Sequence, residues 1–329
     1  MFKSIIYIEK DILKSKSTKQ IVDIIKPNDI IVIDNYKEVL NQTNSNWHFN
    51  KQFQKFILSK RKDEFYYKGS YLTSDMNQKY FYYNTLALNC LYHCEYCYLQ
   101  GMYNTPHLVM FLNNKDFITA TKNLLKQTKE KIYLALSYDT DLPALEKYYP
   151  YCKEWIEFAN KEKNITIEIR TKSNNTEFIE NSKPSENVVL SFTLSPIEIQ
   201  KKYEPFTPTL KQRLNTLKFA INKGFKTMIC IDPIIYLPDY KEIYSSFINE
   251  ITKEIPLSEN ISASIGVFRM NNDFLKRIRK NGNTSDLMYY NYEVKNKVAT
   301  YPENIRKEMI MFVKNELIKN GLKNIHIYD

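Results

Sequence analysis

Apolar, strand-like runs alternate with helical segments from Phe81 onward, and this alternation restricts the possible folds more than any other feature of the chain. The expected strands are Phe81–Leu88, Lys131–Ser137, Ile165–Arg170, Val188–Leu194, Lys226–Ile231 and Ser262–Phe268. The expected helices are Asn114–Gln127, Leu142–Glu162, a short one at Asn175–Asn181, Thr209–Asn222 and Tyr240–Ile251. Such alternation implies right-handed crossovers and a parallel sheet. Six units predict an α/β fold with a partial (β/α)6 barrel of the TIM type.

The residues on either side of this pattern predict two smaller parts. Residues 1–78 read as a small N-terminal α/β domain, with strands at Ser4–Ile8 and Asp29–Asp34 and helices at Thr18–Ile25 and Phe49–Leu58. Residues 79–329 would form the partial-barrel domain, which ends in an extended, tyrosine-rich stretch with a hairpin and in a helix over Pro302–Asn320.

Three of the five cysteines, Cys90, Cys94 and Cys97, lie in one loop with the spacing C-x3-C-x2-C. Three thiolates can hold three corners of a [4Fe-4S] cluster and leave one iron open for a small molecule. The alternatives are a structural zinc site or three unrelated thiols. Zinc prefers four ligands, and His93 is too close to Cys94 in sequence to reach the same ion easily. Cys152 and Cys230 fit buried, small apolar positions.

Most residues that follow the predicted strands have polar, charged or thiol side chains, which can bind ligands or take part in chemistry. Parallel barrels place their active sites at the C-terminal ends of the strands. These positions are Cys90, Cys94, Cys97, Tyr138, Asp139, Thr140, Asp141, Thr171, Lys172, Thr193, Ser195, Asp232 and Arg269. Taken singly, each would serve as a cap or turn residue. Their shared place on one rim indicates an active site.

The formal net charge of +10 favours polyanionic partners. An AT-rich coding sequence would give the same abundance of Lys, Asn, Ile and Tyr without a nucleic-acid partner. The basic run Leu275–Asn283 and the tyrosines of Met288–Tyr292 could hold phosphates and stack bases, or form a solvated helix and an edge hairpin. No apolar run has the length of a membrane span, and the start of the chain does not resemble a signal peptide, so we expect a cytoplasmic protein without membrane contact.

The cysteine loop, with Tyr96 before its last cysteine, resembles the signature of the radical S-adenosylmethionine (SAM) superfamily. Within that superfamily, Cys94–Gln100 resembles the spore photoproduct lyase family. The resemblance continues from about Tyr82 to Pro233, through these segments: Leu136–Asp141, Ala144–Glu146, Arg170–Lys172, Phe192–Pro196, Lys202–Glu204, Thr207–Pro208, Arg213–Leu214 and Gly224.

This resemblance implies a radical SAM partial barrel and a role for each matching residue. Cys90, Cys94 and Cys97 would bind the [4Fe-4S] cluster. Lys172 would pair with the SAM carboxylate, and Thr140, Asp141 and Thr193 would bind other polar groups of SAM. Tyr96 and Tyr98 would line the site and return a hydrogen atom. An external one-electron reductant such as flavodoxin or ferredoxin would supply electrons.

The family reverses a methylene-bridged thymine dimer in DNA, so the resemblance implies DNA carrying a thymine lesion as partner. Tyr138 stands where the family has its hydrogen-donor cysteine, and Tyr289–Lys295 lacks the arginine of the family's hairpin. Either Tyr138 takes over as a catalytic hydrogen donor, or the enzyme uses its radical on another substrate. A non-catalytic, metal-bound nucleic-acid-binding protein is the hypothesis from another functional class.

Overall fold

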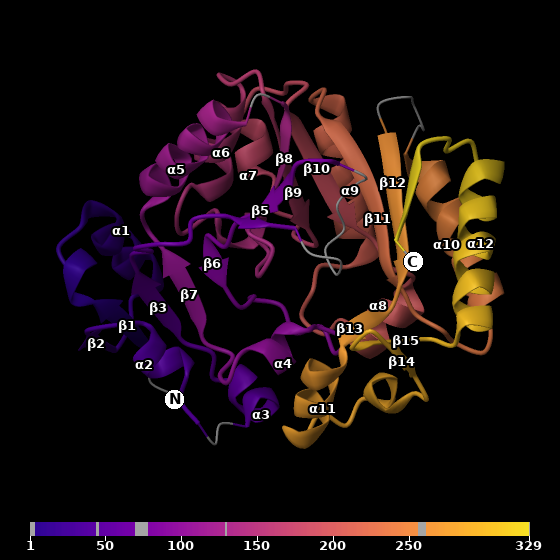
Figure 1. Ribbon diagram of the computed structural model, residues 1–329, viewed down its shortest axis with the longest axis horizontal. Helices are drawn as coiled ribbons and strands as arrows, with labels where there is room; N and C mark the ends of the chain where they lie inside the picture. Colours follow the sequence, from indigo (N-terminus) through magenta and orange to yellow (C-terminus); the bar gives the residue numbers. More distant parts are fainter. Residues whose placement is uncertain (1–3, 44–45, 70–77, 129, 256–260, 329) are drawn as a thin grey trace. The chain divides into compact units, whose positions relative to one another are not determined.

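The computed structural model describes residues 4–43, 46–69, 78–128, 130–255 and 261–328 (Figure 1). Its contacts divide the chain into two compact units. The first comprises residues 1–91, 99–169 and 177–183, and the second comprises residues 92–98, 170–176 and 184–329. The predicted domain division between residues 78 and 79 stays a prediction.

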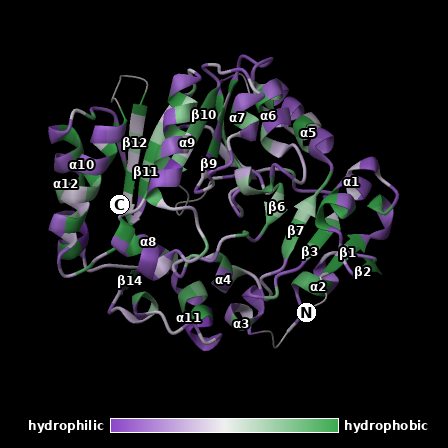
Figure 2. Ribbon diagram, turned by 180° about the vertical axis from the view of Figure 1, so that it is seen from behind, coloured by the Kyte–Doolittle hydropathy of each residue, from purple (hydrophilic) through white to green (hydrophobic). Residues whose placement is uncertain are grey.

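A five-stranded sheet forms the N-terminal part of the first unit, with strand order β2-β1-β3-β7-β6. The strands are β1 (Ile5–Glu9), β2 (Asp29–Ile33), β3 (Phe56–Ser59), β6 (Ala87–Leu88) and β7 (Leu108–Phe111). β1 is parallel to β2 and β3, and β3 is parallel to β7, whereas β6 is antiparallel to β7. Figure 2 shows mostly hydrophobic colours along β3 and β7, as expected of strands with neighbours on both sides.

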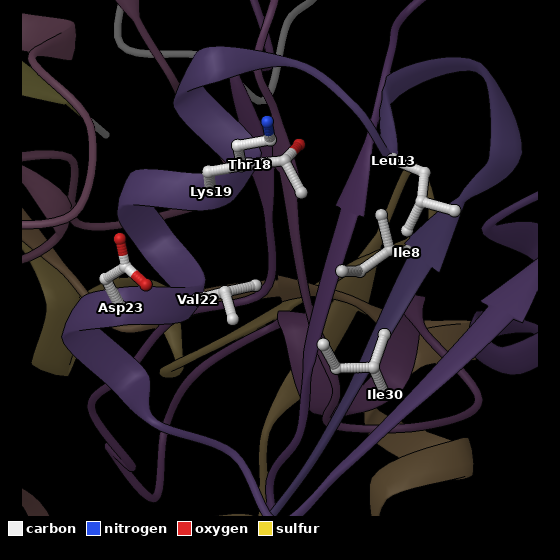
Figure 3. A pocket seen from close by; sticks show the side chains of 7 residues that line it. All are labelled: Ile8, Leu13, Thr18, Lys19, Val22, Asp23 and Ile30. Atoms are coloured by element: carbon white, nitrogen blue, oxygen red, sulfur yellow. The ribbon is translucent and has the colours of Figure 1, made fainter.

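Short helices accompany this sheet: η1 (Lys10–Ile12), α1 (Lys16–Ile25), α2 (Lys37–Leu40) and α3 (Trp47–Lys51). The Ser15 side chain caps α1 by accepting a hydrogen bond from the backbone N–H of Thr18. Between α1 and strands β1 and β2 lies a cavity of about 260 Å³, lined largely by apolar side chains such as Ile8, Val22 and Ile30 (Figure 3).

The edge strand β2 exposes apolar side chains on both faces. Ile30, Ile31 and Val32 are 46%, 39% and 43% exposed. β2 pairs with β1 and stands at the end of the strand order of its sheet.

The predicted helix at Phe49–Leu58 is wrong. The helix there, α3, ends at Lys51, and Phe56–Ser59 forms β3. Ile57 and Leu58 are fully buried between β1 and β7. This burial outweighs the local helical pattern.

The first unit also contributes the strands β4 (Tyr67–Lys68), β5 (Phe81–Tyr83), β8 (Ile132–Leu136) and β9 (Ile165–Thr171), of which β9 ends in the second unit. β5, β8 and β9 are parallel neighbours, and β4 is antiparallel to β5. The helices of this part are α4 (Leu99–Met102), α5 (Asn114–Gln127), η2 (Pro143–Leu145), α6 (Tyr151–Ala159) and α7 (Glu177–Glu180). The predicted strand Phe81–Leu88 is therefore two strands, β5 and β6, which belong to different sheets.

In the second unit, β10 (Val188–Thr193), β11 (Lys226–Ile234), β12 (Ile261–Val267) and β16 (Ile325–Tyr328) are consecutive parallel neighbours. The helices that connect and cover them are α8 (Ile197–Tyr203), α9 (Leu210–Asn222), α10 (Tyr240–Glu254) and α12 (Glu303–Lys319). α10 and α12 lie side by side, and α12 packs on β12 (Figure 1).

A small antiparallel sheet with strand order β13-β15-β14 completes the second unit. Its strands are β13 (Arg269–Asn271), β14 (Glu293–Lys295) and β15 (Val298–Thr300), and the helices α11 (Asn272–Lys280) and η3 (Asp286–Tyr289) lie between them in sequence. The basic run thus forms a helix as far as Lys280. The stretch Met288–Tyr292, which was expected to be extended, begins inside η3, and the hairpin of β14 and β15 follows it from Glu293.

The predicted fold class is confirmed: the chain is a mixed α/β protein with a curled, mainly parallel sheet of the partial-barrel type and a separate N-terminal sheet. The barrel strands are shared between the two units. Among the described residues, no helix is both long and apolar enough to cross a membrane.

Candidate active site

The cysteine loop begins at Asn89, directly after β6. Asn89 is fully buried and has a positive φ of 64°, a conformation that asparagine tolerates better than most residues. Its side-chain Nδ2 donates hydrogen bonds to the carbonyls of Thr105 (2.9 Å) and His107 (2.8 Å). This buried side chain fixes the direction in which the chain enters the loop.

Cys90, the first predicted cluster ligand, belongs to the first unit. Its backbone carbonyl accepts hydrogen bonds from Lys51 Nζ and from Gln54 Nε2, the second at 3.0 Å. Gln54 also donates to the carbonyl of Pro106 at 2.6 Å. These bonds hold the backbone of Cys90, whose side chain is half-buried.

Cys94 and Cys97 belong to the second unit and lie at the two ends of a tight turn. The backbone N–H of Cys97 donates to the carbonyl of Cys94 at 3.1 Å. None of the five cysteines, all of which are among the described residues, forms a disulfide bond. Thiols that are not oxidised, two of them on one turn, have the chemistry that an iron–sulfur cluster requires.

The residues between these two cysteines are held by the end of α8. The backbone N–H of Glu95 donates to the carbonyl of Tyr203 at 2.8 Å, and the hydroxyl of Tyr96 donates to Glu204 Oε1. Asn283, which is buried, donates from Nδ2 to Glu95 Oε2 at 3.2 Å. Tyr98, the last tyrosine of the loop, is half-buried just before α4.

Glu204 is the centre of a buried polar network. Besides Tyr96, its carboxylate accepts a hydrogen bond from Ser195 Oγ (2.8 Å) and forms an ion pair with Arg213 Nη2 (2.5 Å). Burial alone would raise the pKa of Glu204, but the positive charges of Lys172 and Arg213 and the hydrogen bond from Tyr96 outweigh it and lower the pKa. Glu204 is therefore an ionised carboxylate in the interior.

Arg213 extends this network to the end of β10. Its side chain is fully buried, and Nη1 donates to the carbonyl of Thr193 at 3.1 Å. The same guanidinium donates to Pro208 O and Thr207 Oγ1 at 2.8 and 2.6 Å. Thr193, a predicted SAM ligand, is thus fixed through its backbone.

Sequence reasoning did not assign a role to Glu204 or Arg213. Both lie in segments that carry the family resemblance, but the partner that ties them to the cysteine loop is distant in sequence: Tyr96 precedes Glu204 by 108 positions. One signal in the sequence could have revealed them: the charged side chains of Glu204 and Arg213 stand at positions where the apolar pattern predicts burial. Such residues are almost never fully buried unless they are paired.

Lys172, the predicted partner of the SAM carboxylate, follows the end of β9. Its Nζ lies 5.4 Å from the centroid of the Tyr96 ring, in the geometry of a cation–π contact. The structure thus brings Lys172, Tyr96 and Glu204 together within the second unit.

The other predicted residues, Tyr138, Thr140 and Asp141, follow β8 in the first unit. Asn84 anchors this turn, since its Oδ1 accepts from Ser137 N (2.8 Å) and its carbonyl accepts from Tyr138 N (3.1 Å). Ser137 has a positive φ of 53°, which turns the chain sharply after the strand. Asp141 Oδ1 accepts from Ala144 N at 3.2 Å at the start of η2, so part of its carboxylate has a structural role.

Thr140 carries a buried hydroxyl that lacks a hydrogen-bond partner within the described part of the chain. A buried hydroxyl without a partner costs free energy, so a ligand that bonds to it gains affinity. Thr140 therefore fits the predicted contact with a polar group of SAM.

The ring of Tyr138 packs against Tyr83, with ring centroids 5.4 Å apart, and Tyr83 in turn stacks on Tyr67 at 5.2 Å. β4 and β5 place Tyr67 directly opposite Tyr83. Tyr138 is half-buried.

In the second unit, the strand register places polar side chains on one face of the sheet. Thr193 lies opposite Cys230, and Cys230 lies opposite Ser264. Asp232 follows in an irregular part of β11, where the register with β12 shifts between Ile231 and Ile234. Asp232 precedes a cis proline and accepts two hydrogen bonds from Arg269, at 2.9 and 3.2 Å.

The tyrosines before the hairpin differ in their availability. Tyr292 stacks on Phe268 (4.8 Å) and also contacts Tyr301 (5.3 Å), so its ring is used inside the second unit. Tyr289 is 55% exposed, and the Arg279 guanidinium lies 5.6 Å from its ring. Between Tyr289 and Tyr292, the ring of Tyr289 is the better candidate for stacking on a base or another external aromatic ring.

The family model described as spore photoproduct lyase matches residues 1–325. The spore photoproduct lyases of a Geobacillus species and of Bacillus subtilis are 22% and 21% identical to this chain over 172 residues, which is 52% of this chain and 50% of each relative. An uncharacterised protein of Methanocaldococcus jannaschii is 30% identical over 166 residues, 47% of this chain and 60% of that protein. The chain thus spans about half the length of the spore photoproduct lyases that it matches.

Solved structures show the same fold along the whole chain. Spore photoproduct lyase complexed with dinucleoside spore photoproduct superposes with a TM-score of 0.85 at 14% identity, covering 100% of this chain and 98% of that one. A double mutant of spore photoproduct lyase with bound AdoMet (SAM) and dinucleoside spore photoproduct has a TM-score of 0.82 at 14% identity, covering 100% and 99%.

Proposed function

Because the chain belongs to the spore photoproduct lyase family, we propose that it is a radical SAM enzyme that acts as a carbon–carbon lyase on a thymine lesion in DNA. The observation that carries this proposal is the group formed by Lys172, Tyr96 and Glu204 beside the turn from Cys94 to Cys97. The ammonium that would pair with the SAM carboxylate thus lies in the same unit as Cys94 and Cys97, two of the proposed cluster ligands.

The donor set fits a [4Fe-4S] cluster. Cys90, Cys94 and Cys97 would hold it through three thiolates, since none of them is used in a disulfide bond. When bound and reduced by a protein such as flavodoxin or ferredoxin, the cluster supplies the electron that cleaves SAM to a 5′-deoxyadenosyl radical.

The chain's own residues would bind and orient the reactants. Lys172 would pair with the carboxylate of SAM, for which its ammonium is a suitable point charge. The buried hydroxyl of Thr140 would bind another polar group of SAM. Asp141 and Thr193 would bind further ones. Tyr138 would give a hydrogen atom to the thymine radical, and Tyr98 would take part in its return.

A second candidate function is supported by Tyr138 itself. A phenol is bulkier than a thiol and a poorer hydrogen donor, so the same radical could serve a different substrate, such as another modified nucleic acid or a nucleotide. This alternative keeps the cofactors and changes only the molecule that the radical attacks.

The experiment is anaerobic reconstitution with iron and sulfide, followed by dithionite, SAM and a synthetic dinucleotide spore photoproduct. 5′-Deoxyadenosine and thymidylyl-thymidine are measured together. Both products would support lesion repair. 5′-Deoxyadenosine alone would favour the second candidate, and iron-loaded protein that leaves SAM intact would revive a non-catalytic nucleic-acid-binding protein.

A further inference from the structure

We infer that Glu204 is a positioning residue which joins the cysteine loop to Lys172, and that Tyr96 serves this arrangement instead of carrying a hydrogen atom. The inference rests on the proposed function, because it concerns how the SAM site is held. It divides the two loop tyrosines, Tyr96 and Tyr98, into different roles.

The first argument is the geometry of the Glu204 carboxylate. Oε1 accepts from the hydroxyls of Tyr96 and Ser195, and Oε2 accepts from Arg213. Both oxygens are therefore used, and the side chain is fully buried. A buried carboxylate with several donors is held in one position, so each donor is held as well.

The second argument concerns Tyr96, whose hydroxyl and ring both already have partners within the second unit. Its hydroxyl donates to Glu204, deep in the second unit, and the face of its ring lies against the ammonium of Lys172. Hydrogen transfer to a carbon radical requires the phenolic hydrogen to point at the radical. The hydrogen of Tyr96 points instead at a buried carboxylate.

The third argument is the grouping of the chain segments. Residues 92–98 and 170–176 both belong to the second unit, although the chain on both sides of each segment belongs to the first. Glu204, Ser195 and Arg213 lie in the same second unit. The loop of Tyr96 and the segment of Lys172 are therefore held by a common body, and Glu204 is the side chain in it that reaches Tyr96.

Lys172 is held in this arrangement by two effects. The ring of Tyr96 attracts its ammonium through the quadrupole, and the negative charge of Glu204 attracts it as well. If the hydroxyl of Tyr96 is removed, the ring is no longer tied to Glu204 and Lys172 loses its fixed neighbour. The affinity for SAM should then fall before any radical is formed.

The test uses the reconstituted full chain with an oxidised cluster, so that SAM binds without being cleaved. SAM dissociation constants are measured for wild type, Tyr96→Phe and Glu204→Gln. The control is Glu198→Gln, at an exposed position of α8, the helix that ends directly before Glu204. Tyr96→Phe should weaken SAM binding about tenfold, the size expected when one hydrogen bond to a charged group is lost. Glu198→Gln should bind like wild type.

A second readout separates positioning from hydrogen transfer. In Tyr96→Phe, saturating SAM should restore the wild-type ratio of repaired dinucleotide to 5′-deoxyadenosine, because the hydrogen path is intact. The electron paramagnetic resonance signal of the reduced cluster with SAM should broaden or shift, whereas the signal without SAM should stay unchanged.

Two results would overturn the inference. One is an unchanged SAM affinity in Tyr96→Phe together with 5′-deoxyadenosine that forms without repaired product, which would make Tyr96 a hydrogen carrier. The other is a wild-type protein that fails to bind SAM, which would remove the proposed function and this inference together. Since Glu204→Gln leaves Arg213 buried without its counter-charge and can prevent folding, Tyr96→Phe decides the matter alone.

Discussion

The side chain of Arg269 lies against Gly266 and forms an ion pair with Asp232. A β-carbon at position 266 would lie 2.8 Å from Arg269 Nη1, 3.1 Å from the carbonyl of Tyr328 and 3.2 Å from Asp232 Oδ1. Arg269 donates to both carboxylate oxygens of Asp232, and Arg170 Nη1 lies 3.8 Å from the same carboxylate. Glycine fits this position because the ion pair occupies the space that a side chain would need.

Gly266→Ala should therefore lower the free energy of unfolding by about 1–3 kcal/mol, the usual cost of overpacking a well-filled interior. Urea denaturation measures this change. The same substitution made in an Arg269→Ala background should cost less, because the closest contact is gone. Equal costs in both backgrounds would show that Arg269 does not limit the space at position 266.

Arg213→Met should destabilise the protein strongly, because it leaves the Glu204 carboxylate buried without its ion-pair partner. Removing one partner of a buried pair costs about 3–5 kcal/mol. Lys241→Met provides the control, since the Lys241–Glu308 pair is about half exposed on each side and such pairs contribute little. Similar urea midpoints for the two variants would contradict a large stabilising contribution of the buried Arg213–Glu204 ion pair.

Glu146 should make the stability of the protein depend on pH. Burial raises the pKa of Glu146 to about 7 from an ordinary value of 4.5. Its carboxylate accepts hydrogen bonds from the backbone N–H groups of Lys153 and Cys152, which lower the pKa but do not outweigh burial. The unfolded chain gives up this proton first, so stability is full below about pH 4.5 and falls until about pH 7. The total loss should be about 3 kcal/mol.

Unfolding curves at several pH values check this dependence. Glu146→Gln should remove the fall between pH 4.5 and 7, whereas Glu157→Gln, on the exposed side of α6, should keep the wild-type profile. Parallel profiles for wild type and Glu146→Gln would contradict a buried, protonated Glu146.

Cys94→Ala should fold normally but lose both iron and SAM cleavage, since the substitution removes a thiolate from the loop without disturbing a core side chain of the sheets. Iron content and 5′-deoxyadenosine formation measure the two effects. Cys230→Ala, at a buried position of β11, should keep its iron. A Cys94→Ala protein with full iron would remove Cys94 from the ligand set.

Tyr138→Phe should keep SAM cleavage and lose repaired thymidylyl-thymidine by at least an order of magnitude. The variant keeps the ring that packs against Tyr83, so it should still fold. Wild-type repair by Tyr138→Phe would mean that the hydrogen comes from another residue, and Tyr98→Phe would then be the next variant to assay.

The partial barrel could be predicted because its pattern is local. Helix α5 has the predicted ends, Asn114 and Gln127, since a regular apolar periodicity is bounded by polar residues. Strands β8 to β12 were predicted to within three residues at each end, because buried parallel strands form continuous apolar runs.

The errors arise where distant residues decide the structure. Leu58 is strand because β1 and β7 flank it, and nothing near it in sequence reveals that. The run from Phe81 is interrupted at Asn84 because that residue bonds to the turn after β8. The Glu204 network was missed for the same reason, since its partners come from three separate segments of the chain.

The edge strand β2 affects how this protein behaves in concentrated solution. Its backbone edge and the side chains of Ile30, Ile31 and Val32 form a template onto which another extended chain can pair. The net charge of +10 opposes such pairing through mutual repulsion between molecules. Because salt shortens the range of that repulsion to about 8 Å at physiological ionic strength, self-association should increase with salt and begin at β2.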